Sequence, residues 1–157
     1  MFKQILYQFI FHFVFIICAH STEFKITSDN LEVDRENKIS IFSGSVYAHS
    51  SDLEIWSSKL TIQFNKNEDK VQQIHAEDEV KIINRGVTAT GEMSIYYPET
   101  ETLNMYRNVE ILQNDNYVTC DELFLDIKNS TSIMKSNANN KVEAYIRGLK
   151  VTYKRQK

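Results

Sequence analysis

The sequence lacks most of what catalysis and metal binding require. Of its four histidines only His49 and His75 lie beyond residue 21, and neither has a partner at a metal-ligand spacing. There is no nucleophile elbow, no glycine-rich phosphate-binding loop and no His-Glu-x-x-His helix. The acidic run 77–79 is most simply a solvated turn or strand face. We therefore expect no enzyme, no cofactor and no metal site.

The sequence also lacks an excess of positive charge and a pair of cysteines for a disulfide. If residues 1–21 are removed, Lys3 goes with them, and the remaining 17 basic residues face 21 acidic ones, a net charge of −4. Such a chain is not built to coat nucleic acid or an anionic bilayer. Cys18 would be lost too, which leaves Cys120 alone, so packing must stabilise the domain. Cys120 is expected to be a buried small side chain rather than a reactive thiol.

No apolar run is long enough for a clear membrane span. The longest, residues 5–18, is broken only by Gln8 and His12, follows Lys3, and precedes Ala19-His20-Ser21. This order predicts a secretory signal peptide over residues 1–21. The alternative is a retained membrane anchor, but a transmembrane helix needs about 20 mostly apolar residues. We expect export to the periplasm by a cleavable signal, followed by one domain over residues 22–146.

Beyond residue 22, apolar and polar residues alternate almost everywhere, as in Leu60, Ile62 and Phe64. A period of two is typical of half-buried strands. No window of a dozen residues has an apolar stripe with the helical period of 3.6. Polar segments such as 34–38, 65–70 and 98–101 separate the strands as turns. The domain is therefore expected to be all-β.

A motif of eight residues, in the order apolar, any, small, Asp-like, any, apolar, any, apolar, recurs four times. The copies are 26–33 (ITSDNLEV), 55–62 (IWSSKLTI), 88–95 (TATGEMSI) and 118–125 (VTCDELFL). A fixed period of about 30 residues indicates a stacked repeat. The first apolar residue and the last two lie an odd number of positions apart, so a straight strand would put them on opposite faces. The strand must bend between them, which predicts corners between two sheets at Ser28, Asp29, Ser57, Ser58, Thr90, Gly91, Cys120 and Asp121.

A second element precedes each later octet: residues 42–46 (FSGSV), 76–80 (AEDEV) and 105–109 (MYRNV). Each unit is then a hairpin with a kink in its second strand. Stacking such units buries an apolar seam between two sheets, as in a solenoid. It also leaves an open strand edge at each end, near residues 24–26 and 141–146, able to accept another strand.

Together, the signal peptide, the ITSDNLEVDRENK opening, the FSGSV segment and the octets resemble the OstA-like family of periplasmic lipopolysaccharide-transport proteins, which includes LptA. The resemblance covers residues 26–127 and extends more loosely to about 146; Ser45 replaces the usual Asn, and Asp78 and Arg107 stand at glycine-like positions. It implies a twisted β-jellyroll, open at both ends, that holds the acyl chains of lipopolysaccharide between its sheets. It also implies end-to-end joining by edge-strand pairing, with LptC-like and LptD-like domains or with further copies, into a periplasmic bridge.

A lipid groove of this kind would be lined by inward apolar side chains. One enclosed twelve-carbon chain would gain on the order of 10 kcal/mol at about 0.8 kcal/mol per methylene, so a carrier that must release its load needs an open groove. Simple core packing is the alternative role for every residue of the expected lining. That lining is Phe42, Val46, Leu60, Ile62, Phe64, Val80, Ile82, Met93, Ile95, Tyr97, Met105, Val109, Leu123 and Leu125.

The C-terminal segment, residues 147–157, is basic, with Leu149, Val151 and Tyr153 alternating between the charges. It is either a tail that contacts lipid phosphates or an acidic partner, or an edge strand whose lysines discourage pairing. Two other functions stay open beside the carrier. One is an inner-membrane-anchored, LptC-like component, if residues 5–18 are retained. The other is a lipid-free secreted β-sandwich or adhesin.

Overall fold

The computed structural model describes residues 24–51, 53–66, 70–137 and 139–147. All regular secondary structure within these ranges is β-strand, which confirms the all-β expectation. Among the same residues, no helix is long and apolar enough to cross a membrane. The expected signal peptide and residues 148–157 of the basic segment lie outside the described residues.

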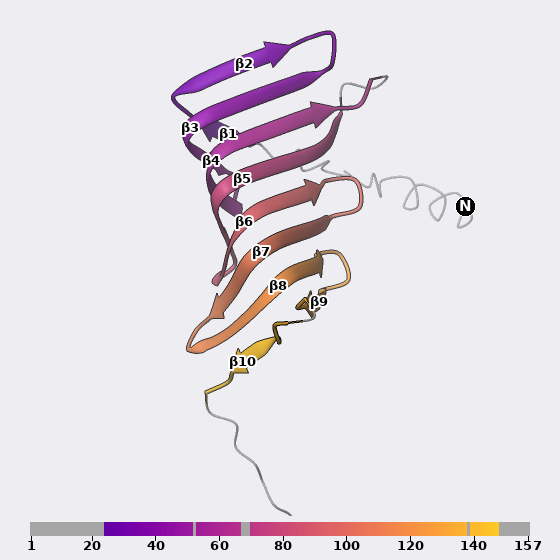
Figure 1. Ribbon diagram of the computed structural model, residues 1–157. Helices are drawn as coiled ribbons and strands as arrows, with labels where there is room; N and C mark the ends of the chain where they lie inside the picture. Colours follow the sequence, from indigo (N-terminus) through magenta and orange to yellow (C-terminus); the bar gives the residue numbers. More distant parts are fainter. Residues whose placement is uncertain (1–23, 52, 67–69, 138, 148–157) are drawn as a thin grey trace, which may run out of the picture.

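The strands form one antiparallel sheet that follows the chain as a meander (Figure 1). Each strand from β2 to β9 pairs with the next, while the short terminal strands β1 and β10 pair with β3 and β8. The bounds are β1 (Lys25–Thr27), β2 (Asn30–Asp34), β3 (Ile39–His49), β4 (Leu53–Phe64), β5 (Val71–Asn84), β6 (Val87–Tyr97), β7 (Thr102–Gln113), β8 (Asn116–Asp126), β9 (Thr131–Lys135) and β10 (Glu143–Tyr145).

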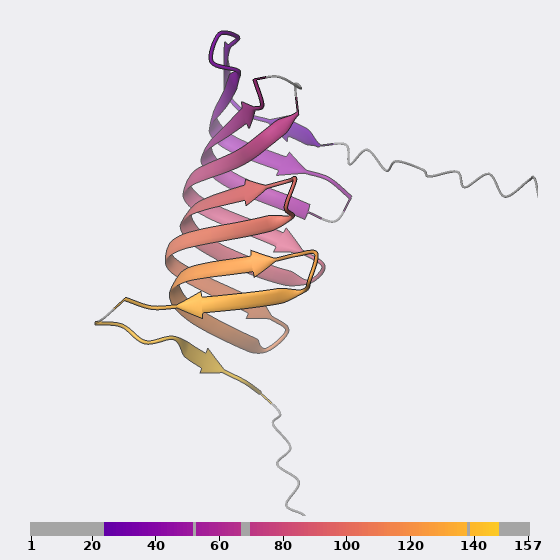
Figure 2. The same cartoon turned by 90° about the vertical axis from the view of Figure 1, so that its right-hand side faces the viewer.

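The six long strands, β3 to β8, bend near their middle and fold the sheet onto itself (Figure 2). One half of each long strand lies in a layer that begins with β2 and ends with β9, here the β2–β9 layer. The other halves lie in a layer that begins with β1 and ends with β10, the β1–β10 layer. Residues from both layers, including Leu60 and Met105 from one and Ala48 from the other, form a single hydrophobic core.

The bends are β-bulges that repeat in alternate strands. Each pairing of β3, β5 or β7 with the following strand shifts register at the bend, where the first strand carries one more residue. At each bulge, two consecutive residues of the first strand have positive φ and face a single residue of the next strand. These pairs are Gly44 and Ser45, Asp78 and Glu79, and Arg107 and Asn108. Asp78 and Arg107, which replace glycine-like positions, thus share the left-handed conformation of Gly44, an uncommon one for residues with a side chain.

Both strands of each unit bend, which differs from the expected kink in the second strand alone. The left-handed pair lies in the first strand, inside the FSGSV, AEDEV and MYRNV segments. The octets supply the opposite side of the same corner, where β4, β6 and β8 pass the bend with one residue fewer. The two repeated sequence elements are therefore the two halves of one structural corner.

The expected edge strands are present as β1 and β10, but each end of the sheet has a second edge strand. The first octet is split: β1 and β2 lie in different layers, joined by Ser28 and Asp29. At the other end, β9 and β10 lie in different layers and are joined by residues 136–142. Each end of the molecule therefore presents one free strand edge in each layer.

Candidate lipid groove

The strand register arranges the inward side chains in rows that cross the whole sheet. One row of the β2–β9 layer is Leu31, Phe42, Leu60, Ala76, Ser94, Met105, Leu123 and Met134, one residue from each of eight strands. Its neighbour is Val33, Ser40, Ile62, Ile74, Tyr96, Leu103, Leu125 and Ser132. At roughly 4.8 Å per strand spacing, each row is about 34 Å long.

The β1–β10 layer contributes a matching row on its inward face. It consists of Ile26, Ala48, Ile55, Ile82, Ala89, Ile111, Val118 and Ala144. All eight side chains are apolar, and three are alanines, whose small size leaves room for the facing layer. The space between the layers is therefore mainly apolar from one end of the molecule to the other, with Ser40, Ser94 and Ser132 as the polar members of its rows.

In the middle of the molecule the layers are packed against each other. Leu60, Met105 and Ala48 are fully buried, so the central lining forms a closed core. Towards the ends the same rows open: Leu31 is 56% exposed, and Ala144 is exposed at the other end. Apolar surface is thus accessible at these two ends and sealed in between.

Most of the expected lining lies on the inward face. Val46, Leu60, Ile62, Val80, Ile82, Met105, Val109 and Leu123 belong to the buried core, and Phe42, Phe64 and Leu125 pack against it. Sequence reasoning missed other inward residues of the same rows: Ile26, Leu31, Val33, Ala48, Ile55, Ile74, Ala76, Ala89, Tyr96, Leu103 and Ile111.

Met93, Ile95 and Tyr97 are a correction, because they lie on the outward face of the β2–β9 layer. Their strand turns Ser94 and Tyr96 inward instead, with Ser94 only 3% exposed. The octet in β6 actually spans residues 89–96 (ATGEMSIY), one position later than expected, so that Met93 takes the place of Lys59 in the register. A serine in a core position hid the true alignment, since it breaks the apolar pattern.

Shifting this octet also corrects the corner. Gly91 lies at the bend as expected, and a Cβ added to it would lie 3.4 Å from Met105 Cε. Glu92, rather than Gly91, holds the Asp-like position of the octet, and Thr90 faces outward. Glu92 accepts a hydrogen bond from Asn108 Nδ2 at 2.6 Å and pairs with Arg107 Nε at 2.8 Å. Its carboxylate therefore stabilises the left-handed pair of the following strand.

Acidic residues also make contacts at the bend in the first and last octets. Asp29 N donates to Gly44 O at 2.9 Å, and the Asp29 carboxylate fills the space where a Cβ of Gly44 would lie. Asp121 Oδ2 accepts from Asn137 N at 2.7 Å, and Asn140 Nδ2 donates to Asp121 Oδ1 at 3.1 Å. Ser58 takes this position in the second octet, and Ser28 Oγ donates to Asn30 O at 2.8 Å beside the first.

Few polar groups face the core, and the structure keeps them neutral. Ser57 is 7% exposed and its Oγ has no hydrogen-bond partner among the described residues. Burial raises the pKa of the Tyr96 phenol, with a smaller contribution from the charge of Glu101. Burial, followed by the Asp121 charge, raises the pKa of the Cys120 thiol, so this cysteine is a small buried side chain as expected.

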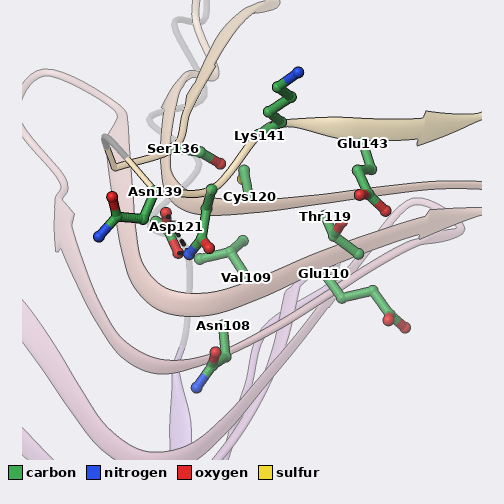
Figure 3. A pocket seen from close by; sticks show the side chains of 11 residues that line it. Asn108, Val109, Glu110, Thr119, Cys120, Asp121, Ser136, Asn139, Lys141 and Glu143 are labelled. Atoms are coloured by element: carbon green, nitrogen blue, oxygen red, sulfur yellow. Dashed lines mark hydrogen bonds between the residues drawn. The ribbon is translucent and has the colours of Figure 1, made fainter.

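A cavity of about 620 Å³ lies at the C-terminal end, between β7, β8 and the β9–β10 connection (Figure 3). Asn108, Glu110, Asp121 and Glu143, which Figure 3 labels, line it, and Asn140 Nδ2 donates a hydrogen bond to Asp121 Oδ1 at its wall. Its walls are mainly polar, which does not suit an acyl chain.

Comparison with known proteins places this geometry in context. Residues 25–131 match a family model described as LptA/(LptD N-terminal domain) LPS transport protein. The fold is similar to the crystal structure of LptH, the LptA-homologous periplasmic component of the lipopolysaccharide transport device of Pseudomonas aeruginosa. The TM-score is 0.72 at 11% identity, over 81% of this chain and 96% of that one. No curated protein sequence matches.

Proposed function

The chain belongs to the family of LptA and LptD N-terminal-domain lipopolysaccharide transport proteins, and we propose that it is a periplasmic carrier that holds lipopolysaccharide acyl chains between its two layers. As a bridge it joins like domains end to end. The observation that carries this proposal is the run of three mainly apolar rows across the whole sheet, which are buried in the middle and end in exposed side chains at Leu31 and Val33 on one side and at Ala144 on the other.

The packed middle of the groove suits a carrier that must release its load. An acyl chain can enter the seam only if the two layers move apart, because Leu60, Met105 and Ala48 are fully buried between them. Contacts between the protein layers are then exchanged for contacts with lipid, so the net gain is smaller than the roughly 10 kcal/mol of a fully buried twelve-carbon chain. The bulged corners, which link the layers along one side only, are where such opening would hinge.

Site-specific photo-crosslinking tests the groove. Val33 lies at the open end of an inward row, with 55% of its surface exposed, and the adjacent Glu32 faces outward. We expect a photoreactive residue at Val33 to crosslink to purified lipopolysaccharide, and one at Glu32 to crosslink much less. Ile62 and Ile95 form a second pair, inward and outward. Equal crosslinking from both faces would contradict a groove between the layers.

Aspartate substitutions give an independent measure. Ile62→Asp places a carboxylate on the inward face, while Thr61→Asp places one on the outward face of the same strand. Lipid capture by Ile62→Asp should fall well below that of Thr61→Asp, provided that circular dichroism shows both variants folded. Loss of capture in both variants, or in neither, would count against the proposed lining.

The proposed location follows from the same family. A periplasmic carrier begins near Thr22 after cleavage of the signal peptide, whereas an LptC-like component keeps residues 5–18. Mass spectrometry of the exported protein distinguishes the two, because the intact chain would retain the mass of the N-terminal segment. We expect the shorter species, in the periplasmic fraction.

A further inference from the structure

An aromatic cluster lies on the outward face of the β1–β10 layer, near its N-terminal end. The ring centres of Tyr47 and Trp56 are 5.1 Å apart, and those of Tyr47 and His49 are 5.3 Å apart in a stacked pair. Lys81 Nζ lies 5.1 Å from the centre of the Trp56 ring, which is a cation–π contact. Lys25 lies opposite His49 on the neighbouring strand. These five residues are called the aromatic platform below.

The repeat itself does not require a tryptophan at this place. Trp56 is the second residue of its octet, and the other three octets have a threonine there: Thr27, Thr90 and Thr119. All four residues lie in one outward row of the sheet. Packing between Tyr47 and Trp56 also stabilises the sheet, as cross-strand aromatic pairs do. The only tryptophan of the chain is nevertheless an addition to the outer surface, since the other units form the same corner without it.

Positive charge surrounds these rings. Lys25 and Lys81 are exposed, and neither has an ion-pair partner among the described residues. The acidic neighbour on the same face is Glu54, whose carboxylate accepts a hydrogen bond from the Tyr47 hydroxyl at 3.0 Å. Glu110 is the next charge along the row of Lys81, two strands away. The aromatic platform therefore combines ring faces with two ammonium groups that are suited to an anion.

The aromatic platform lies at the open side of the groove. Opposite the corners, the β1–β10 layer ends in hairpin turns (Figure 2), and His49 and Glu54 are the last pair before the first of these turns. Leu53, next to Glu54, packs against the core. A lipid with its acyl chains between the layers would have its head at this rim, two residues or roughly 7 Å along the strand from Trp56.

We propose that the aromatic platform binds the phosphorylated sugar head of lipopolysaccharide. The inference rests on the proposed function and adds to it a site for the part of the lipid that lies outside the groove. The electron-rich face of Trp56 packs against the C–H groups of a sugar ring, while Lys25 and Lys81 donate hydrogen bonds to its phosphates. Lys81 covers the Trp56 ring in the protein alone, and its ammonium group moves from the ring to a phosphate when the sugar binds.

A saccharide without acyl chains tests the aromatic platform by itself. The probe is fully deacylated lipopolysaccharide, which keeps the phosphorylated sugars. Ligand-observed NMR gives its dissociation constant for every variant, because the signals are those of the saccharide. Trp56→Thr, which restores the residue of the other octets, should weaken binding about tenfold while circular dichroism shows a folded protein. The matched control is Tyr106→Thr, which removes a ring from the outward face of the other layer and should leave binding unchanged.

Removing the phosphates separates the two kinds of contact. The wild type should bind the dephosphorylated saccharide about tenfold more weakly than the phosphorylated one, and Lys81→Gln should lose most of this difference. Lys135→Gln makes the same change of charge at an exposed position of the other layer and should keep the difference. Because Lys81 is exposed, its variant decides the outcome if Trp56→Thr does not fold.

The opposite results would overturn the proposal. They are no binding of the phosphorylated saccharide, equal binding by Trp56→Thr and the wild type, equal affinity for the two saccharides, or losses of the same size in the control variants. Lipid crosslinking at Val33 reports on the groove alone. Crosslinking without saccharide binding would remove the aromatic platform and leave the carrier function, whereas saccharide binding without crosslinking would contradict the groove.

Discussion

Gly44→Ala is expected to destabilise the protein more than the same change at Gly86. Both glycines have positive φ, 79° at Gly44 and 82° at Gly86, so alanine meets the same backbone cost at each. The surroundings differ: a Cβ at Gly86 has no heavy atom within 4 Å, whereas one at Gly44 would overlap the Asp29 carboxylate. Comparing the two positions therefore isolates the contact that stabilises the first corner.

The magnitudes follow from these contacts. Left-handed φ costs an alanine about 1 kcal/mol, which is the whole effect expected at Gly86. At Gly44 the Asp29 side chain must also move, at a cost of about 1–3 kcal/mol for overpacking. Movement of this link endangers the hydrogen bond from Asp29 N to Gly44 O as well. Together these effects predict a loss of about 2–4 kcal/mol for Gly44→Ala.

Urea unfolding measures both variants. Trp56 is the only tryptophan of the chain and lies in β4, so its fluorescence reports on the folded sheet. Asp29→Ala combined with Gly44→Ala should cost less than the sum of the two single changes, because the smaller side chain removes the overlap. Equal losses at Gly44 and Gly86, or strict additivity in the double variant, would refute the role given to Asp29.

Three further predictions concern the core, the C-terminal corner and the carboxylate of Glu77. Leu60→Ala should lower the free energy of unfolding by about 2–5 kcal/mol because Leu60 is fully buried, while the outward Thr61→Ala should change it by less than about 0.5 kcal/mol; similar losses would contradict the assignment of faces. Cys120 should react with a thiol reagent much more slowly in the folded protein than in the unfolded protein, because it is buried. Asp121→Ala should speed the reaction by releasing Asn137 and Asn140. An unchanged rate in this variant would show that these contacts do not protect the thiol. A hydrogen bond from Lys59 lowers the folded-state pKa of Glu77 below its usual 4.5, so this pair stabilises the protein above that pH, and its contribution disappears as the pH falls through the lowered pKa. In acid titrations of unfolding, Lys59→Ala should therefore remove a small part of the pH dependence of stability. A profile identical to that of the wild type would argue against the pair.

The sequence predicted the fold well because its repeats encode the corners directly. The Asp-like position and the FSGSV-type segments each recur at a fixed place, and a bulge needs small or left-handed residues wherever it occurs. Gly44 signals that conformation by its residue type. Asp78 and Arg107 do not, and their place became clear only from alignment with Gly44.

The groove was predicted less well, because alternation gives two faces without saying which is inside. In β6 the apolar pattern favours Met93, Ile95 and Tyr97, but the inward positions are Ser94 and Tyr96. Neighbouring strands decide the face, since Ser94 must lie between Ala76 and Met105 in the row. Strand pairing is a long-range property that a single octet does not contain.

The ends of the groove also depended on partners distant in sequence. Leu31 and Val33 belong to an octet and were expected to form part of a strand, but their exposure arises because β2 is an edge strand of its layer. At the other end, residues 136–142 replace a two-residue bulge and separate β9 from β10. Composition gives no sign of this change, which the hydrogen bonds to Asp121 stabilise.

The separation of the two layers during loading tests the central claim most directly. Leu112 and Phe124 are exposed on the outward faces of opposite layers, so spin labels at these positions, in a Cys120→Ala background, report the distance across the groove. Pulsed electron paramagnetic resonance should show this distance lengthen when lipopolysaccharide binds, because acyl chains must part the packed seam. A bound protein whose distance does not change would contradict the placement of lipid between the layers.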